Sequence, residues 1–531
     1  MVKFFKENKK VFIFLFGLLL FISCFRVLPI YFIEKIIDLA STSNIGINQE
    51  NIYKIIKIGF FFILVNILKS FLFSVSKWFS ENNQAKISTN LKILIFEKFS
   101  KIKFEYLNKI NISSLSLSII EDSEKIGENI ITLYSEIILS FFTFLFGIYF
   151  FSRINFLLII YVFPPVLILI LIVNKISQNI KSIIFLSKAK LINILGLFND
   201  GVLGIKTLKV HQIEKEFLEK IKKDSLSLQE VKIKQAELKS INFFFSDITF
   251  IISFGITLII ASIFVKKNYL TIGELTAILM YNHLLTDPIL KLIELYPKII
   301  EILNCLKRIE EIKIFPEEKE KIYGKVDKIE LKEITVKFGE NIIQSNINLT
   351  INSSFGIFGE SGKGKSSLLN IISGLIEPQM GKIYYYFNGK KVNYFPRVSY
   401  MMQDDFIFNM SLKENILLGS KNFTENEYKE ILKICNLEYL DFRYKEKNIG
   451  KNGGTLSGGE RTRIKIARAL ANKEADIFLF DEISAGVDSE NLFNIFNNIE
   501  NFLKKQNKIR IYVDHSNYIK EQLENYIFIK W

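Results

Sequence analysis

Six long apolar stretches fill the first 305 positions of this 531-residue chain. A helix needs roughly 20 consecutive apolar residues to cross the hydrocarbon core of a bilayer. Inside lipid the backbone must satisfy its own hydrogen bonds, which helices do within one segment. The stretches therefore predict an all-α domain with six transmembrane helices in a lipid bilayer. The expected spans are residues 11–33, 55–79, 130–151, 154–173, 241–265 and 271–303.

The chain carries a formal net charge of +14, which by itself would also fit a protein that binds nucleic acid. Within the first 305 positions, however, the lysines are concentrated near the N-terminus and in the two long connections after the second and fourth spans. Because basic residues favour the cytoplasmic side of a membrane, these segments and both termini are expected in the cytoplasm. Arg153 and the pair Lys266-Lys267, on short outer turns, are exceptions. We therefore expect no nucleic acid as a partner and place the protein in a cell membrane, a bacterial inner membrane in our interpretation.

Residues 1–24 also resemble a secretory signal, because a basic start precedes an apolar run and Ser23-Cys24 lies where a lipoprotein signal could be cleaved. Phe21 and Ile22 fit such a site poorly, and the apolar stretch continues to Phe32. A first transmembrane helix is the better interpretation.

The composition changes after the sixth span. Residues 306–327 are charged and contain Pro316 and Gly324, which is typical of a linker. Beyond them, alternating residues predict strands over 329–338 and 342–351, followed by an apolar run, a glycine-rich loop and a helix. We therefore expect a multi-domain chain, with an all-α transmembrane domain over 1–305 and an α/β domain over 328–531.

A glycine-rich segment lies between an apolar strand and a helix. It matches the phosphate-binding pattern GxxxxGK(S/T), in which backbone N–H groups at a helix N-terminus surround a phosphate. We expect Lys365 to reach the β- and γ-phosphates of ATP and Ser366 to hold Mg²⁺; a chance glycine-rich turn is the alternative. The expected nucleotide-binding residues here are Gly359, Glu360, Ser361, Gly362, Lys363, Gly364, Lys365, Ser366 and Ser367.

Two acids end a second apolar strand, residues 477–482. This puts Asp481 and Glu482 at the carboxyl edge of the sheet, beside the phosphates. Asp481 is expected to contact Mg²⁺ through water, and Glu482 to act as the general base that orients and deprotonates the attacking water. Capping of a helix by the two acids is the alternative.

The segment LSGGE, residues 456–460, precedes a basic amphipathic helix. Ser457 lies at the start of that helix, and Gly458 and Gly459 allow close backbone approach, so the segment suits a phosphate. Since the domain already has one phosphate loop, this second site is explained if it serves ATP held by another subunit.

These motifs in this order resemble the ABC transporter superfamily, in which LSGGE is similar to the signature motif. The resemblance covers nearly the whole chain. It implies an α/β P-loop ATPase domain with a helical signature subdomain. It also implies that Gln403 contacts Mg²⁺, that His515 contacts the γ-phosphate, that Asp488 belongs to the D-loop and that Phe338 stacks on adenine.

Residues 201–219 and 406–419 and Asp122 resemble the exporter branch, in which membrane and ATPase domains share one chain. Since that machine needs two of each domain, the resemblance implies a dimer with a second copy or a close paralogue. Two departures are that Lys451 replaces an acidic residue and that residues 481–488 read DEISAGVD where the family usually has DEPTSALD, although Asp488 is retained.

The implied function is ATP-driven export of a peptide, an amphipathic drug-like molecule or a lipid by alternating access. An ATP-gated channel or regulator is the alternative, and the apolar spans exclude a soluble nucleic-acid ATPase. Arg26 is the polar residue within a span most suggestive of substrate contact, and it would favour an anionic group. The other polar residues within the spans that could line a pathway are Asn66, Lys69, Glu136, Asp247, His283 and Asp287.

Overall fold

The computed structural model describes residues 9–41, 49–107, 110, 115–116, 118–338, 341–360, 362–420, 423–444, 447–450 and 453–529. The side chains of residues 157–179, 336–338 and 341–345, and of a few positions in the later helices, also lie outside this description. The chain divides into two compact units, Met1–Ile102 with Lys109–Pro316, and Lys103–Asn108 with Glu317–Trp531.

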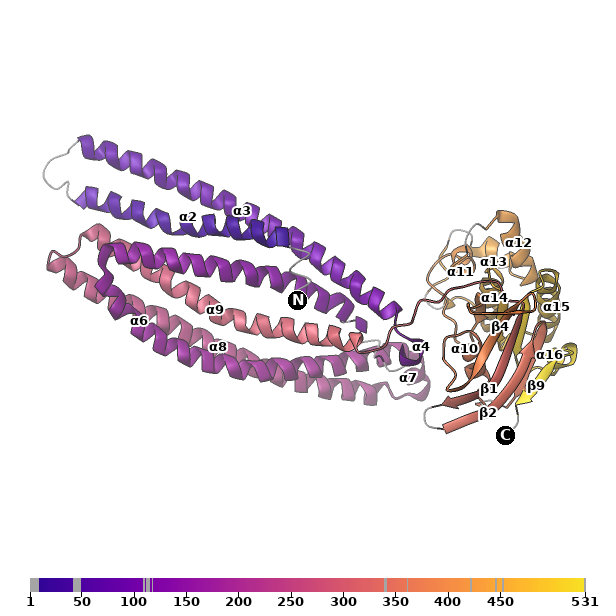
Figure 1. Ribbon diagram of the computed structural model, residues 1–531. Helices are drawn as coiled ribbons and strands as arrows, with labels where there is room; N and C mark the ends of the chain where they lie inside the picture. The colour runs from indigo at the N-terminus through magenta and orange to yellow at the C-terminus, as the bar shows by residue number, and fades with distance from the viewer. Residues whose placement is uncertain are drawn as a thin grey trace. The chain divides into compact units, whose positions relative to one another are not determined.

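Long helices that lie side by side make up the first unit (Figure 1). The longest of them continue well past a bilayer, because 52 residues of α3 span about 78 Å at 1.5 Å per residue, against a hydrocarbon core of about 30 Å. The helices are α2 (Lys9–Ser41), α3 (Gln49–Ser100), η1 (Ser118–Asp122), α6 (Ser123–Leu203), α7 (Ile205–His211), α8 (Glu214–Lys266) and α9 (Ile272–Lys313).

Helices cover all six expected spans. The third and fourth lie within α6, whose backbone leaves helical geometry at Asn155 with φ −157° and ψ 110°. Across the described residues, five helical stretches are long and apolar enough to cross a membrane: Lys9–Ser41, Gln49–Ser100, Ser118–Phe156, Ser182–Leu203 and Glu214–Lys266. Ser182–Leu203 is not among the expected spans. The side chains of most of the fourth expected span lie outside the description. The helix α9, which contains the sixth expected span, is not one of the five. These helices indicate a multi-pass membrane protein; the number six stays a prediction.

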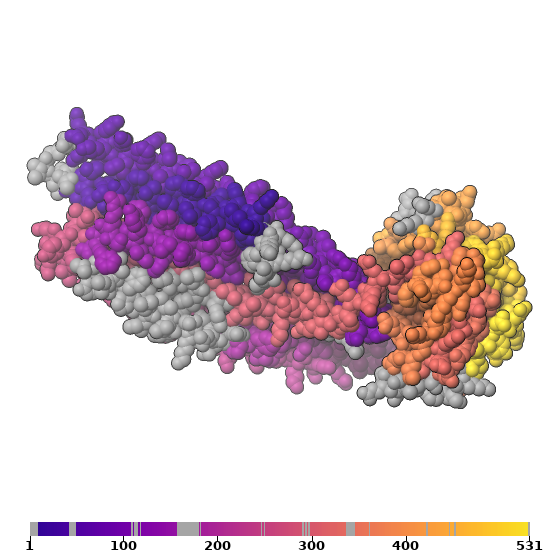
Figure 2. All heavy atoms as spheres, in the orientation of Figure 1, coloured from indigo at the N-terminus to yellow at the C-terminus, as the bar shows by residue number. Residues whose placement is uncertain are grey.

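The surface of α3 is apolar over much of its length, and this helix lies along one edge of the unit in Figure 2. A soluble protein rarely exposes so large an apolar strip, whereas lipid tails cover it at little cost. Large side chains that are exposed on the membrane part of α3 are Ile56, Phe60, Phe61, Ile63, Leu64, Ile67, Phe71 and Phe73.

One bidentate ion pair joins η1 to α9 within the first unit. Nε of Arg308 donates to Oδ2 of Asp122 at 2.7 Å, and Nη2 donates to Oδ1 at 2.6 Å. The Asp122 side chain is only 4% exposed. Because planar guanidinium and carboxylate groups match in this geometry, the pair fixes the C-terminal part of α9 to the turn that precedes α6.

The second unit contains two sheets. One is antiparallel with the order β2-β1-β4-β5, and the other is parallel with the order β6-β7-β8-β3-β9. Strands β7 and β8 are buried at every position, as expected for a parallel sheet covered on both faces. The strands are β1 (Lys328–Phe338), β2 (Asn341–Ile351), β3 (Ser354–Gly359), β4 (Met380–Phe387), β5 (Lys390–Val392), β6 (Val398–Met401), β7 (Ile477–Asp481), β8 (Ile509–Val513) and β9 (Tyr526–Ile529).

Helices of the second unit pack on the parallel sheet and form a group beside it (Figure 1). Ser411, Thr424 and Ser457 each start a helix with a capping box, so local sequence sets these helix starts. The helices are α4 (Phe104–Leu107), α10 (Lys365–Ile372), α11 (Leu412–Ile416), α12 (Glu425–Ile434), α13 (Glu438–Tyr444), α14 (Gly458–Leu470), α15 (Ser489–Lys505) and α16 (Asn517–Gln522). The expected fold class, an all-α membrane domain followed by an α/β domain with a helical subdomain, is confirmed.

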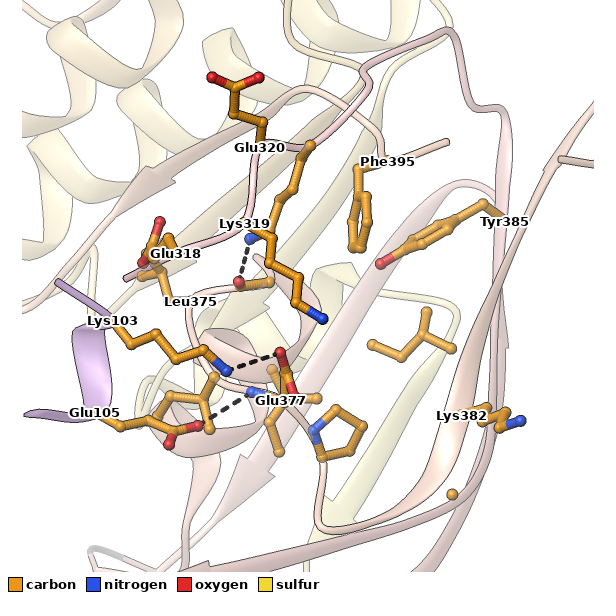
Figure 3. A pocket seen from close by; sticks show the side chains of 17 residues that line it. Lys103, Glu105, Glu318, Lys319, Glu320, Leu375, Glu377, Lys382, Tyr385 and Phe395 are labelled. Atoms are coloured by element: carbon orange, nitrogen blue, oxygen red, sulfur yellow. Dashed lines mark hydrogen bonds and ion pairs between the residues drawn. The ribbon is translucent and has the colours of Figure 1, made fainter. Parts of the chain in front are cut away.

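The division after Pro316 falls within the expected linker, 306–327, whose limits stay a prediction. The six residues Lys103–Asn108, in contrast, pack with the second unit although they follow α3 in the sequence. Nζ of Lys103 lies 3.1 Å from Oε1 of Glu377, and the backbone N–H of Glu377 donates to Glu105 at 3.3 Å. Figure 3 shows these contacts beside a pocket of about 440 Å³ near the C-terminal end of α10.

A partly buried carboxylate ties α15 to the parallel sheet. Glu500 accepts hydrogen bonds from Ser354 at 2.9 Å, from Tyr512 at 2.7 Å and from Nη2 of Arg510 at 2.9 Å. Replacement of Glu500 by Ala would leave the Arg510 charge buried, so we expect the free energy of opening β8 to fall by about 2–4 kcal/mol. Hydrogen exchange of the β8 amides in the full chain measures this change.

Glu490→Ala is the matched control, since Glu490 is an exposed carboxylate on the same helix. Its removal should cost less than about 1 kcal/mol, the usual value of an exposed acid near a helix N-terminus. Equal effects of the two substitutions would show that the Glu500 cluster adds no stability of its own.

Candidate functional site

The phosphate loop follows β3 and leads into α10. Gly362 and Gly364 both have φ of 77°, a left-handed conformation that glycine adopts without steric cost. Gly364 caps α10, so the free N–H groups of that helix start directly after the loop. This arrangement suits an anion at the helix N-terminus, as the sequence predicts. Ser361 lies outside the described residues, and Ser367 lies in the first turn of α10.

The ammonium group of Lys365 is buried within this loop. Its Nζ donates to the carbonyl oxygen of Gly359 at 2.8 Å and to that of Glu360 at 2.7 Å. Burial lowers the pKa of Lys365, and the nearby carboxylates of Glu482 and Asp481 oppose this shift. The cation is therefore held between the loop carbonyls and the two acids that end β7.

Asp481 lies at the end of β7 and is 2% exposed. Burial raises the pKa of its carboxyl group, while a hydrogen bond with the Ser366 hydroxyl lowers it. Tyr400 of β6 also bonds to this carboxylate. Hydroxyl and carboxylate oxygens are ligands of the type that Mg²⁺ prefers, so Ser366 and Asp481 fit the expected ion.

Glu482 follows with a left-handed backbone, φ 58°, which costs a residue with a Cβ atom about 1–2 kcal/mol. Its N–H donates to the carbonyl of Val513 at 2.8 Å, which holds this conformation in place. Strained residues that the surrounding fold holds in this way are concentrated at functional sites. The conformation supports a role for the Glu482 side chain other than packing.

Two residues that the sequence placed only by resemblance lie beside Glu482. Nε2 of Gln403 donates to Oε2 of Glu482 at 2.7 Å, and Nε2 of His515 lies 3.7 Å from Oε1. The same His515 nitrogen lies 3.4 Å from Nζ of Lys365. The structure thus brings Gln403, Glu482, His515 and Lys365 into one group at the carboxyl edge of the parallel sheet, where open α/β folds bind ligands.

The turn that starts α14 is built differently. Ser457 and Glu460 form a capping box, so the hydrogen bonds of Ser457 stay within this turn. Ser457 and Gly458 are exposed. A Cβ atom on Gly459 would lie 2.5 Å from the carbonyl oxygen of Gly486, so this position requires glycine. The helix start is therefore open to a ligand brought by another molecule.

Asp488 caps α15 through the N–H of Asn491 at 2.9 Å. Its segment is held against α14, because the Thr462 hydroxyl donates to the carbonyl of Ala485 at 2.8 Å. The expected signature and D-loop residues thus form one surface of a single chain. The side chain of Phe338 and residue Lys451 lie outside the described part of the chain.

Sequence reasoning missed two residues that support the site. Tyr400 contacts Asp481, as described above. Asp514 is 1% exposed and accepts from the N–H and hydroxyl of Ser484 and from the N–H of Ser516. It therefore braces the loop after Glu482 against the segment that holds His515. Its position directly before His515, at the end of an apolar strand, is the one local signal that could have identified it.

Comparison with known proteins gives two family matches. A family model described as ABC transporter matches residues 344–485, and one described as ABC transporter transmembrane region matches residues 12–289. The first match contains the phosphate loop and the strand that ends in Asp481, and the second covers most of the helices of the first unit.

Individual relatives agree with these matches. The multidrug resistance-like ATP-binding protein MdlA of Buchnera aphidicola subsp. Baizongia pistaciae is 25% identical over 95% of this chain and 89% of its own length. The lactococcin-G-processing and transport ATP-binding protein LagD of Lactococcus lactis subsp. lactis is 26% identical over 62% of this chain, which spans about half of that relative, 49%. A solved structure of a bacterial Atm1-family ABC exporter with ATP bound has a TM-score of 0.86 at 15% identity, covering 99% of this chain and 94% of that one.

Proposed function

The chain belongs to the ABC transporter family, with its membrane and ATPase domains fused as in the exporters, and from this premise we propose that it hydrolyses ATP to move a peptide, an amphipathic drug-like molecule or a lipid out of the cytoplasm or the inner leaflet. The observation that carries the proposal is the group formed by Lys365, Gln403, Glu482 and His515 beside the Ser366–Asp481 pair. The names of MdlA and LagD, which refer to multidrug resistance and to lactococcin, support the first two substrate classes.

In this proposal the phosphate loop holds the phosphates and Lys365 turns from the loop carbonyls to the β- and γ-phosphates of ATP. Ser366, Asp481 and Gln403 would hold Mg²⁺, which when bound would neutralise charge that develops on the phosphates. Gln403 could take part because its amide nitrogen binds Glu482, which leaves its amide oxygen available as a ligand. The proposed contribution of Phe338 is to stack on adenine.

Glu482 then orients the attacking water and accepts its proton, and His515 contacts the γ-phosphate. The hydrogen bond from Gln403 limits the rotation of the Glu482 carboxylate and leaves its second oxygen, 3.7 Å from Nε2 of His515, to accept the proton. Positioning of this kind supplies a large part of the rate enhancement in phosphoryl transfer.

We further propose a dimer, with a second copy or a close paralogue as the partner. Ser457 of the partner subunit, with its Gly458, Gly459 and Asp488, would complete each ATP site, because this surface is exposed in one chain and includes a helix N-terminus suited to a phosphate. A two-fold axis then makes two equal sites. Closure of the sites on ATP would open the membrane cavity outward, and hydrolysis would reset it. Six spans and cytoplasmic termini, in a bacterial inner membrane, complete the proposal.

Transport by purified protein in liposomes tests this function. ATPase domains that face the outer medium, supplied there with Mg²⁺ and ATP, should drive uptake of at least one of a cationic dye, a fluorescent peptide and a fluorescent lipid. Lys365→Ala should abolish both uptake and phosphate release, because it removes the cation that holds the transferred phosphate. ATP hydrolysis without uptake of any of the three classes would argue for the gating role instead.

A further inference from the structure

A cavity of about 650 Å³ lies among α2, α3, α8 and α9 of the first unit. Pockets for small organic molecules usually have volumes of about 300–1,000 Å³. The cavity is separate from the ATP site, since all its lining residues belong to membrane helices. No residue of the nucleotide chemistry described above takes part in it.

Most of the cavity wall is apolar. Aromatic rings from two helices face it, Phe62 from α3 and Phe250 and Phe254 from α8, and Leu279 and Met280 of α9 extend the apolar surface. The apolar body of a ligand could replace water against these side chains, and each buried methylene group contributes about 0.8 kcal/mol.

The polar lining is basic. Arg26, Lys69 and His283 contribute nitrogen groups, and no aspartate or glutamate is among the lining residues within the described part of the chain. The amide of Asn66 accepts a hydrogen bond from Nζ of Lys69 at 2.8 Å, which satisfies one donor but does not neutralise the charge.

The charge of Arg26 is only partly balanced. Its Nη2 lies 2.8 Å from Oδ2 of Asp287, and Nζ of Lys291 lies 3.0 Å from the same oxygen. One carboxylate thus serves two cations and leaves one positive charge in excess. His283 packs its ring edge-on against Phe250 at 5.2 Å. Asp247, on the same helix as Phe250, is exposed and is not a lining residue.

Unbalanced positive charge against apolar walls is costly inside a membrane unless an anion is bound there. We propose that this cavity binds an amphipathic anion, with its charged group between Arg26 and Lys69 and its apolar body against the phenylalanines. The inference rests on the proposed transport function, of which it names the substrate class. The anion is either an anionic membrane lipid or a single-chain amphiphile from the cytoplasm, and both share this chemistry.

Equilibrium binding of radiolabelled dodecyl phosphate to the full-length protein in phosphatidylcholine nanodiscs tests the proposal, with empty nanodiscs as the blank. Saturable binding is expected for the wild type. Lys69→Gln and Arg26→Gln should each weaken it about tenfold, because each removes one charge-assisted contact. Lys77→Gln is the matched control, since Lys77 lies on α3 with a 67% exposed side chain outside the cavity; it should bind like the wild type.

Two further measurements test which charge the head group of the ligand must carry and whether the ligand is a two-chain lipid or a single-chain anion. Dodecyltrimethylammonium, which has the same chain and the opposite charge, should not compete with dodecyl phosphate, whereas Lys69→Glu should allow it to bind. Nanodiscs that contain phosphatidylglycerol should lower the apparent affinity for dodecyl phosphate if a two-chain lipid can enter, and leave it unchanged if the site takes single-chain anions.

Equal binding by wild type, Lys69→Gln and Arg26→Gln, or equal competition by the cationic amphiphile, would overturn the inference. These readouts need no ATP. If the proposed function is wrong, the wild type will show no phosphate release beyond that of Lys365→Ala, whatever the cavity binds.

Discussion

Replacement of Glu482 by Gln is expected to slow ATP hydrolysis by about 100-fold or more while ATP binding is retained. Glutamine has nearly the same shape, and its amide oxygen can still accept the hydrogen bond from Nε2 of Gln403, now 2.7 Å from Oε2 of Glu482. It cannot accept a proton from water. The backbone contact with Val513 does not involve the side chain, so the left-handed conformation should persist.

Two measurements separate the steps. Phosphate release in nanodiscs gives the turnover, and equilibrium binding of labelled ATP gives the affinity. Glu474→Gln is the control, because Glu474 is an exposed carboxylate shortly before the same strand and is far from its carboxyl end. Turnover near that of the wild type would assign the base to another residue, and lost ATP binding would mean that Glu482 acts through the structure of the loop.

The part of the site that the sequence predicts best is the part formed by contiguous residues. The loop at Gly359–Ser366 and the pair Asp481-Glu482 follow from short patterns, because strand, turn and helix are adjacent in the chain. Gln403 and His515 carry no such pattern and were placed by resemblance alone. Their proximity to Glu482 depends on the order of strands β6, β7 and β8 in the sheet, which no local rule supplies.

Supporting contacts were harder to foresee for the same reason. Tyr400 reaches Asp481 across neighbouring strands, and Asp514 reaches Ser484 thirty positions away. The same applies to the segment Lys103–Asn108. Its Glu105 accepts a hydrogen bond from the backbone N–H of Glu377, which lies 272 positions later in the chain. A four-residue helix has too few residues for a periodic signal, so tertiary packing decides its place.

A mixed dimer of two inactive chains is expected to recover about half of the wild-type rate of ATP hydrolysis. One chain carries Lys365→Ala, which removes the phosphate-binding cation, and the other carries Ser457→Arg, which places a bulky side chain on the exposed start of α14. If each site combines the phosphate loop of one chain with Ser457 of the partner subunit, the mixed dimer has one site with both changes and one intact site. Each variant alone has a defect in both sites.

The two chains are co-expressed with different tags, so that sequential purification yields mixed dimers only. A wild-type and Lys365→Ala mixed dimer, prepared in the same way, has one working site and should also show about half of the wild-type rate. Loss of the Ser457 cap costs about 1 kcal/mol, which is small against the stability of the unit, so Ser457→Arg should fold. The prediction is contradicted if this control hydrolyses ATP at half the rate but the doubly substituted dimer does not recover. Ser457 and Lys365 would then act on the same ATP from the same subunit, so one chain would supply a complete site.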